Sequence, residues 1–374
     1  RFVPFDRAYV PRYAPEGFIQ GDSLAERIDA PYRFGPDAFT TFDWGHSSLR
    51  LHHGPVELGA GTENLWWGPG QRYTLMMSNH AAGVPHAFVG TRSPVHLPGR
   101  RTGNLEARWI LGLPRDSEYF DFGWVDFTPE AVKERQRQFL RQRVMNGLQV
   151  VWSPGFVPGL HLGYTRFTQH YLEEGKLRMA DVTRVWRPFP KPDWDEVYST
   201  FRADQSTYER INTSAMASLR WVFPDDHAEV YVEFYKESVH RDLRDWIQEP
   251  QHDRAYNVGF QKLTPARRDA SRLDFSRFTV EFTNLTPTRI DDIRPQTYLY
   301  THKYVKQGHT NGGQVLGAAI GTGADSQFLG YDLFFERAML GIYAQRVTVN
   351  DQFHMELNQR YVRGIGYKEY KHHW

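Results

Sequence analysis

The apolar and polar positions of this chain alternate with a period of two in short runs that turn residues separate. In the run 215–223 the odd-numbered positions are apolar, and the turn 224–227 (Pro-Asp-Asp-His) follows. Val230, Val232 and Phe234 then alternate with glutamates and tyrosines. Similar runs occur at 49–60, 160–165, 278–283 and 353–358. Because successive side chains of a strand point to opposite faces, this pattern predicts antiparallel strands with one apolar and one polar face.

Two all-β architectures fit this alternation. A sandwich packs its apolar faces inward, whereas a transmembrane barrel turns them toward lipid and encloses the polar faces. The sequence has no run of the roughly 18 consecutive apolar residues that a membrane helix needs. A membrane protein without such helices has to be a closed barrel. The barrel interpretation predicts a transmembrane antiparallel β-barrel of about 16–18 strands for 374 residues.

One segment departs from the alternation and predicts a short helical element at about residues 129–146. Thr128 is a suitable N-cap, Pro129 fits the first helical position, and Gly147 can end the helix. Its many Arg and Lys side chains indicate a partly solvated helix. The Gly-rich run 308–323 indicates a long loop. No repeat or composition change marks a boundary, so residues 1–374 are expected to form a single domain.

Composition removes several classes of function. Lys plus Arg is 45 and Asp plus Glu is 44, which gives a net charge of +1 and no basic excess for a nucleic-acid partner. The absence of cysteine excludes disulfides, thiol catalysis and cysteine-type zinc sites. Aromatic residues make up 15% of the chain, a content that suits strands, membrane-interface girdles, sugar-stacking surfaces or simply a large core.

A block of tryptophans carries a family resemblance. Residues 64–70 read Asn-Leu-Trp-Trp-Gly-Pro-Gly, residues 75–81 read Leu-Met-Met-Ser-Asn-His-Ala, and Pro85 follows. This order resembles the Wzi-type capsule-assembly family, in which Trp-Trp-Gly-Pro precedes a hydrophobic run ending in Ser-Asn-Asn and then a proline. His80 stands where the family has its second Asn, and histidine also donates and accepts hydrogen bonds.

The resemblance extends over about residues 60–345. Its further parts are 103–106, 148–154, 160–166, 300–304, 308–317 and 325–326. Fewer residues precede the tryptophan block here than in the family. This difference indicates either that leading strands are missing from the chain or that the barrel is smaller.

The resemblance implies an outer-membrane β-barrel of a Gram-negative bacterium. Such a barrel acts as a lectin that binds or anchors capsular or extracellular polysaccharide at the cell surface and does no covalent chemistry. The expected partners are therefore that polysaccharide and outer-membrane lipid, whereas protein partners are not identified. We expect no cofactor and no nucleic-acid partner.

Two other functions stay open at this point. A porin-like barrel would transport glycan or small solutes, and an open lumen would conduct ions. A glycan-cleaving enzyme would need two carboxylates at a defined separation. Glu229, Glu233 and Glu281 are candidates, but no spacing singles out a pair, and no nucleophile elbow or phosphate-binding loop occurs. We therefore expect the chain not to be an enzyme.

The candidate carbohydrate-binding residues fall in two stretches. Adjacent tryptophans can stack on sugar rings, although a rigid turn with a buried Trp anchor explains them as well. The Arg and His residues after them suit uronic carboxylates, and the loop near residue 308 offers cations and a ring. The candidates are Trp66, Trp67, Arg72, Asn79, His80, His86, Arg92, Lys303, Tyr304, His309 and Asn311. The 16 histidines include no His-Glu-x-x-His pattern, so no metal site is predicted.

Overall fold

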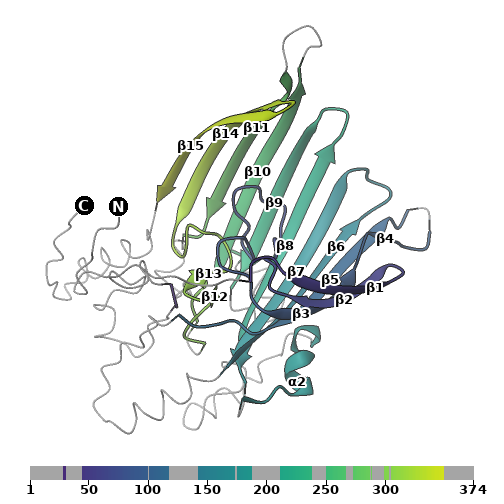
Figure 1. The fold of residues 1–374 in the computed structure, drawn as a ribbon. Helices are drawn as coiled ribbons and strands as arrows, with labels where there is room; N and C mark the ends of the chain where they lie inside the picture. The colour runs from purple at the N-terminus through teal and green to yellow at the C-terminus, as the bar shows by residue number, and fades with distance from the viewer. Residues whose placement is uncertain are drawn as a thin grey trace, which may run out of the picture.

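The computed structural model describes residues 28–30, 44–99, 101–117, 142–172, 175–187, 211–237, 250–266, 273–286, 288, 299–302 and 305–348. Within these ranges one antiparallel sheet of 13 strands dominates (Figure 1). Strand neighbours follow the chain order β1-β2-β3-β5-β6-β7-β8-β9-β10-β11-β14-β15, and β4 pairs with β5. The all-β antiparallel fold that the alternation predicts is confirmed.

The elements have the following bounds. The strands of the sheet are β1 (Ser48–His53), β2 (Val56–Gly61), β3 (His86–Thr91), β4 (Val95–His96), β5 (Asn104–Gly112), β6 (Arg143–Ser153), β7 (Leu160–Tyr171), β8 (Asn212–Phe223), β9 (Ala228–Lys236), β10 (Arg254–Pro265), β11 (Leu273–Asn284), β14 (Asp325–Phe335) and β15 (Ala338–Thr348). The small hairpin is β12 (Thr310–Asn311) with β13 (Gln314–Val315), and the helical turns are α2 (Met179–Val182) and η4 (Arg184–Trp186).

The helix predicted at residues 129–146 is wrong at its C-terminal end. Residues 143–146 are the first four of β6; all four pair with β7, and the last two also pair with β5. All four are buried, so their strand conformation is supported by contacts that local helix propensity does not register. Residues 129–141 lie outside the described residues.

Strand β9 shows which face of the sheet is covered. Glu229, Tyr231 and Glu233 are buried, whereas Val232 between them is 38% exposed. Strand β11 repeats the pattern, with buried Glu281 beside Phe282, which is exposed. The apolar face therefore points outward and the polar, ring-bearing face is enclosed, as in a transmembrane barrel and opposite to a sandwich.

The short connections between strands lie at one end of the sheet and the long connections lie at the other. In an antiparallel meander, successive connections lie at opposite ends. One end has the short connections 54–55, 92–103, 154–159, 224–227, 266–272 and 336–337. The other end has the long connections 62–85, 113–142, 172–211, 237–253 and 285–324. We call these the turn end and the loop end.

Two of the long connections fold back onto the enclosed face of the sheet. We call residues 62–85 and 305–324 the plug. Its Leu75 and Met76 are fully buried in one apolar cluster with Phe167 of β7 and Met216 of β8. The core of this protein therefore lies between the plug and the inner side of the sheet, and β12 and β13 lie in front of the strands (Figure 1).

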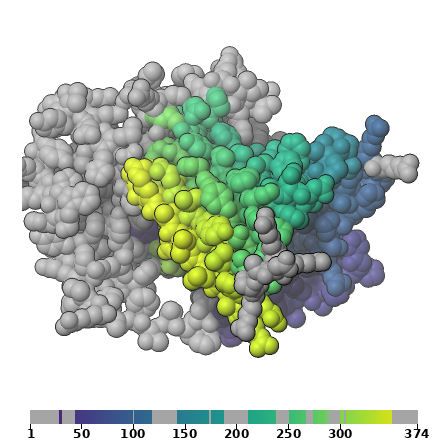
Figure 2. Space-filling model, turned by 90° about the horizontal axis from the view of Figure 1, so that it is seen from above, coloured from purple at the N-terminus to yellow at the C-terminus, as the bar shows by residue number. Residues whose placement is uncertain are grey.

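The edges of the sheet are β1 and β15. Among the described residues no pairing joins these two strands, so the expected 16–18 strands stay a prediction. The outer side chains of β14 and β15 lie at the surface of the molecule, in the green-yellow region of Figure 2. No helix in the described ranges combines the length and the apolar character needed to cross a membrane.

Candidate functional site

Two carboxylates of the sheet hold the tip of the plug. Glu233 accepts hydrogen bonds from the backbone N–H groups of Gly70 at 2.9 Å and Leu75 at 2.8 Å. Glu281 accepts three more, from the N–H groups of residues 71, 72 and 73 at 2.7, 3.0 and 2.8 Å. A Cβ atom at Gly68 would lie 2.1 Å from the Glu233 carboxylate. The glycine of the tryptophan block thus admits this carboxylate at close range.

The two tryptophans of the block have different surroundings. Trp67 is 3% exposed, and a Cβ atom added to Gly147 of β6 would lie 2.7 Å from its ring. Trp66 is 37% exposed, and its Nε1–H donates to the Gly70 carbonyl at 3.0 Å. Trp67 is therefore an anchor of the plug against the sheet. Trp66 presents a fixed ring.

A cavity of about 630 Å³ lies between the tryptophan block and the turn end of the sheet. Glu63, Trp66 and Trp67 line it from the plug, and strands β1, β2, β5 and β6 line it from the sheet, together with Thr91 and Arg92. Its volume falls within the roughly 300–1,000 Å³ of small-ligand sites. Of the eleven candidates from the sequence, the structure brings Trp66, Trp67 and Arg92 together in this cavity.

Four charged side chains form a closed ring in the wall of the cavity. Arg50 of β1 pairs with Glu57 of β2 at 3.4 Å and also with Glu63 of the plug. Arg108 of β5 pairs with Glu63 at 3.5 Å and also with Glu57. Both guanidinium groups stack over Phe88, at 5.3 and 4.7 Å from its ring centre. The ring of charges joins the sheet to the plug and keeps these groups in fixed positions.

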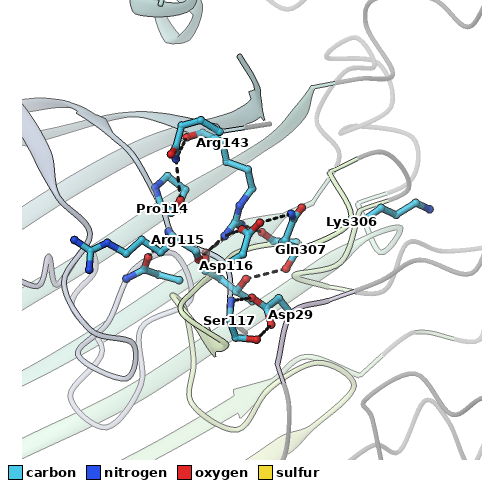
Figure 3. Close-up of polar contacts among 12 residues, drawn as sticks. Asp29, Pro114, Arg115, Asp116, Ser117, Arg143, Lys306 and Gln307 are labelled. Atoms are coloured by element: carbon cyan, nitrogen blue, oxygen red, sulfur yellow. Dashed lines mark hydrogen bonds and ion pairs between the residues drawn. The ribbon is translucent and has the colours of Figure 1, made fainter. Parts of the chain in front are cut away.

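The loop end carries a second polar cluster, around the buried Arg143 (Figure 3). Its guanidinium pairs with Asp116 at 2.9 Å and donates to the carbonyls of Arg115 at 2.8 Å and of Gly308 at 3.2 Å. Asp29 accepts hydrogen bonds from the Ser117 N–H at 2.7 Å and from its hydroxyl at 2.5 Å. Segments from three distant parts of the chain therefore meet at one cation.

Arg72 lies against β14 and β15, away from the strands β1, β2, β5 and β6 that line the cavity. Its guanidinium group donates to Gln345 Oε1 of β15 at 3.2 Å and lies 5.4 Å from the Phe328 ring centre and 5.6 Å from that of Tyr343. Within the described ranges it has no carboxylate partner. The structure therefore places Arg72 as a contact between the plug and β14–β15, apart from Trp66.

Three other candidates are buried and bonded to the plug backbone. Nδ1 of His86 lies 2.7 Å from the Val84 carbonyl, and Nε2 of His309 donates to the Met76 carbonyl at 2.6 Å. Asn311 accepts from the Arg115 N–H and donates to the Ala82 carbonyl, both at 2.8 Å. The Gly-rich run is thus largely buried, not a solvated loop, because its polar groups are paired inside the sheet.

The remaining candidates divide into exposed and undescribed ones. Asn79 and His80 are exposed in the plug. Lys303 and Tyr304 lie outside the described residues.

The carboxylates considered for catalysis all have other partners. Glu229 accepts from Arg220 Nε at 2.9 Å, while Glu233 and Glu281 hold the plug backbone. In the part of the chain that the structure describes, no group of three or more His, Asp or Glu is arranged to hold a metal ion.

Four residues of the cavity wall are not among the candidates from the sequence: Arg50, Glu57, Glu63 and Arg108. Each stands at a polar position of an alternating strand or just after one, as many other charged residues do. Only the pairing of β1, β2, β3 and β5 brings them together. The alternation in residues 49–60 gave the sole signal, by predicting that Arg50 and Glu57 belong to strands.

Comparisons with known proteins agree with this architecture. The family model of the capsule assembly protein Wzi matches residues 16–362. A solved structure of an Escherichia coli protein is similar, with a TM-score of 0.56 at 14% sequence identity; it is described as Wzi, an outer membrane protein involved in group 1 capsule assembly and a carbohydrate-binding β-barrel.

That similarity covers 81% of this chain and 56% of the other, so this chain spans just over half the length of that structure. A search of curated proteins gave no match. Because the family model covers most of the sequence, the chain belongs to the Wzi family of capsule assembly proteins.

Proposed function

We propose that this protein is an outer-membrane barrel that binds or anchors capsular or extracellular polysaccharide at the cell surface, without covalent chemistry. The observation that carries the proposal is the enclosed polar face of a sheet whose exposed side is apolar, in a chain of the Wzi family. A barrel in lipid needs that orientation. The candidates for contact with the surface glycan are Asn79 and His80, which are exposed on the plug.

The lengths of the connections support an orientation in the membrane. Outer-membrane barrels have short periplasmic turns and long extracellular loops. The turn end would then face the periplasm, and the loop end, from which the plug folds inward, would face outside. A plug bonded to the sheet through Glu233 and Glu281 favours a binding protein over an open porin.

A direct test combines membrane fractionation with glycan retention. The protein should sediment with outer membranes and migrate faster on gels when unboiled. In cells that make the capsular polysaccharide but lack this protein, its expression should restore retention of the polysaccharide. Incubation with the polysaccharide should leave its chain length unchanged, and planar bilayers should show no steady conductance. Glycan that stays unbound in the presence of folded, membrane-inserted protein would contradict the proposal; shortened chains would favour an enzyme.

A further inference from the structure

The cavity between the tryptophan block and the turn end has the chemistry of a saccharide site that no comparison assigns. We propose that it binds an uncharged, hydroxyl-rich segment of glycan and that it opens toward the turn end, on the opposite side of the plug from the long loops. This inference rests on the proposed function and adds to it a ligand class and a direction of access.

The cavity offers both of the contacts that a sugar ring needs. A pyranose has an apolar face, which can stack on the Trp66 indole, and hydroxyl groups, which need donors and acceptors. The hydrogen bond from Trp66 Nε1 to Gly70 fixes the indole before a ligand arrives. A platform that is already ordered loses little conformational entropy on binding.

The ring of Arg50, Glu57, Arg108 and Glu63 supplies the polar wall. A guanidinium has five N–H donors, and the bonds to these carboxylates use only some of them. The remaining N–H groups can donate to ligand hydroxyls, while the carboxylate oxygens can accept from them. Because the ring is held by four ion pairs and by Phe88, its groups keep their positions in the absence of ligand.

The charges around the cavity cancel. Arg50, Arg92 and Arg108 face Glu57, Glu63 and Glu106 among the lining residues. A site that selects a polyanion would instead show an excess of cations. A uronate carboxylate would meet Glu106, which forms no ion pair with Lys or Arg among the described residues, as well as Arg92. The balance therefore favours an uncharged sugar.

The positions of the lining residues set the direction of access. His52 and Glu57 are register partners beside the 54–55 turn, and Arg92 follows the last residue of β3. On the loop side, Glu63 to Trp67 of the plug close the cavity. The cavity thus lies between the plug and the short turns, and in the orientation proposed above it is reached from the periplasm.

Binding to an oligosaccharide array tests the ligand class. We expect the purified protein in detergent to bind at least one neutral oligosaccharide more tightly than any uronate oligosaccharide. Tighter binding of uronates, or binding of no neutral probe, would overturn the assignment. Retention of capsular polysaccharide without neutral-probe binding would refute the cavity assignment alone and leave the proposed function standing.

Variants of Trp66 test the place of binding. Trp66→Ala should weaken binding of the neutral probe at least tenfold, and Trp66→Phe, which keeps a ring, should stay within threefold. Trp186→Ala removes an exposed tryptophan of η4, outside the cavity, and serves as the matched control that should bind as the parent protein does. Equal affinity of a folded Trp66→Ala variant would overturn the site.

The absence of cysteine makes the direction of access measurable. Single cysteines are introduced as Glu106→Cys in the cavity, Asp226→Cys in a short turn and Gln251→Cys at the loop end, and cells are treated with a membrane-impermeant maleimide. Glu106→Cys should react as Asp226→Cys does, only after the outer membrane is permeabilised. Reaction of Glu106→Cys in intact cells together with Gln251→Cys, while Asp226→Cys stays protected, would overturn access from the turn end.

Discussion

The carboxylate of Glu281 accepts a hydrogen bond from the backbone N–H of Tyr73, 208 residues earlier in the chain, at 2.8 Å. The same carboxylate accepts from two further N–H groups and from the Tyr231 hydroxyl at 2.7 Å. One acidic side chain of β11 therefore fixes three successive peptide groups of the plug. A neutral amide at this position would have one acceptor oxygen instead of two, and an aspartate would carry its two oxygens on a side chain one methylene shorter.

Replacing this carboxylate should loosen the plug. Glu281→Gln keeps the size of the side chain but turns one acceptor oxygen into a donor that faces N–H groups. Hydrogen bonds to charged groups contribute about 1.5–3 kcal/mol each, so we expect the free energy of unfolding to fall by about 2–3 kcal/mol. Urea titration measures this change, and trypsin cleavage after Arg72 should become faster. Glu336→Gln, at the exposed β14–β15 turn, is the control and should change neither.

A methyl group at Gly147 should displace Trp67. The added Cβ atom would lie 2.7 Å from the Trp67 ring and 3.1 Å from Ile110. Overpacking of this kind typically costs about 1–3 kcal/mol. Gly147→Ala should therefore lower the midpoint of thermal unfolding, and the double variant Gly147→Ala with Trp67→Phe should recover part of the loss. A Gly147→Ala variant as stable as the parent would show that the ring is free to move.

Arg143 should be among the residues whose loss destabilises the protein most. Arg143→Met removes the cation beside the partly exposed Asp116, which keeps its hydrogen bond from Gln307, and takes a donor from three carbonyls. A buried acceptor that loses its donor costs about 1–3 kcal/mol, so we expect the free energy of unfolding to fall by about 3–5 kcal/mol. Arg143→Lys keeps the charge but lacks the planar guanidinium group. The midpoint of its unfolding should therefore lie between those of the parent protein and of Arg143→Met. Equal unfolding midpoints for the Met and Lys variants would mean that the charge contributes nothing.

His309 should make stability depend on pH. Burial lowers the pKa of its imidazole to about 4 from the ordinary 6.5, so the unfolded state takes up the proton first as the pH falls. Above pH 6.5, His309 is neutral in both states and the free energy of unfolding is not reduced. As the pH falls from 6.5 toward 4, the unfolded state is protonated and the folded state is not, so the free energy of unfolding decreases, by about 2 kcal/mol at pH 5. His309→Gln should reduce the difference between unfolding free energies at pH 7.5 and pH 5. An unchanged difference would assign the pH dependence to other groups.

The sequence by itself determined the strands and the family. Period-two alternation is a local property, and it located β8, β9 and β11 without knowledge of their neighbours. The tryptophan block carried the resemblance that the family match confirms. Alternation also required adjacent side chains to differ in surroundings, as Trp66 and Trp67 do.

Only the tertiary structure decided which face is enclosed and what each polar residue contacts. An alternating strand reads the same in a sandwich and in a barrel, because its period carries no direction. Glu233 and Glu281 looked like candidates for catalysis until the plug was seen bound to them. Arg143 looked like part of a solvated helix until its partners, about 28 and 165 residues away, were in place. Such contacts depend on how strands far apart in the chain pair. The sequence of a single segment does not specify that pairing, because its partners lie elsewhere in the chain.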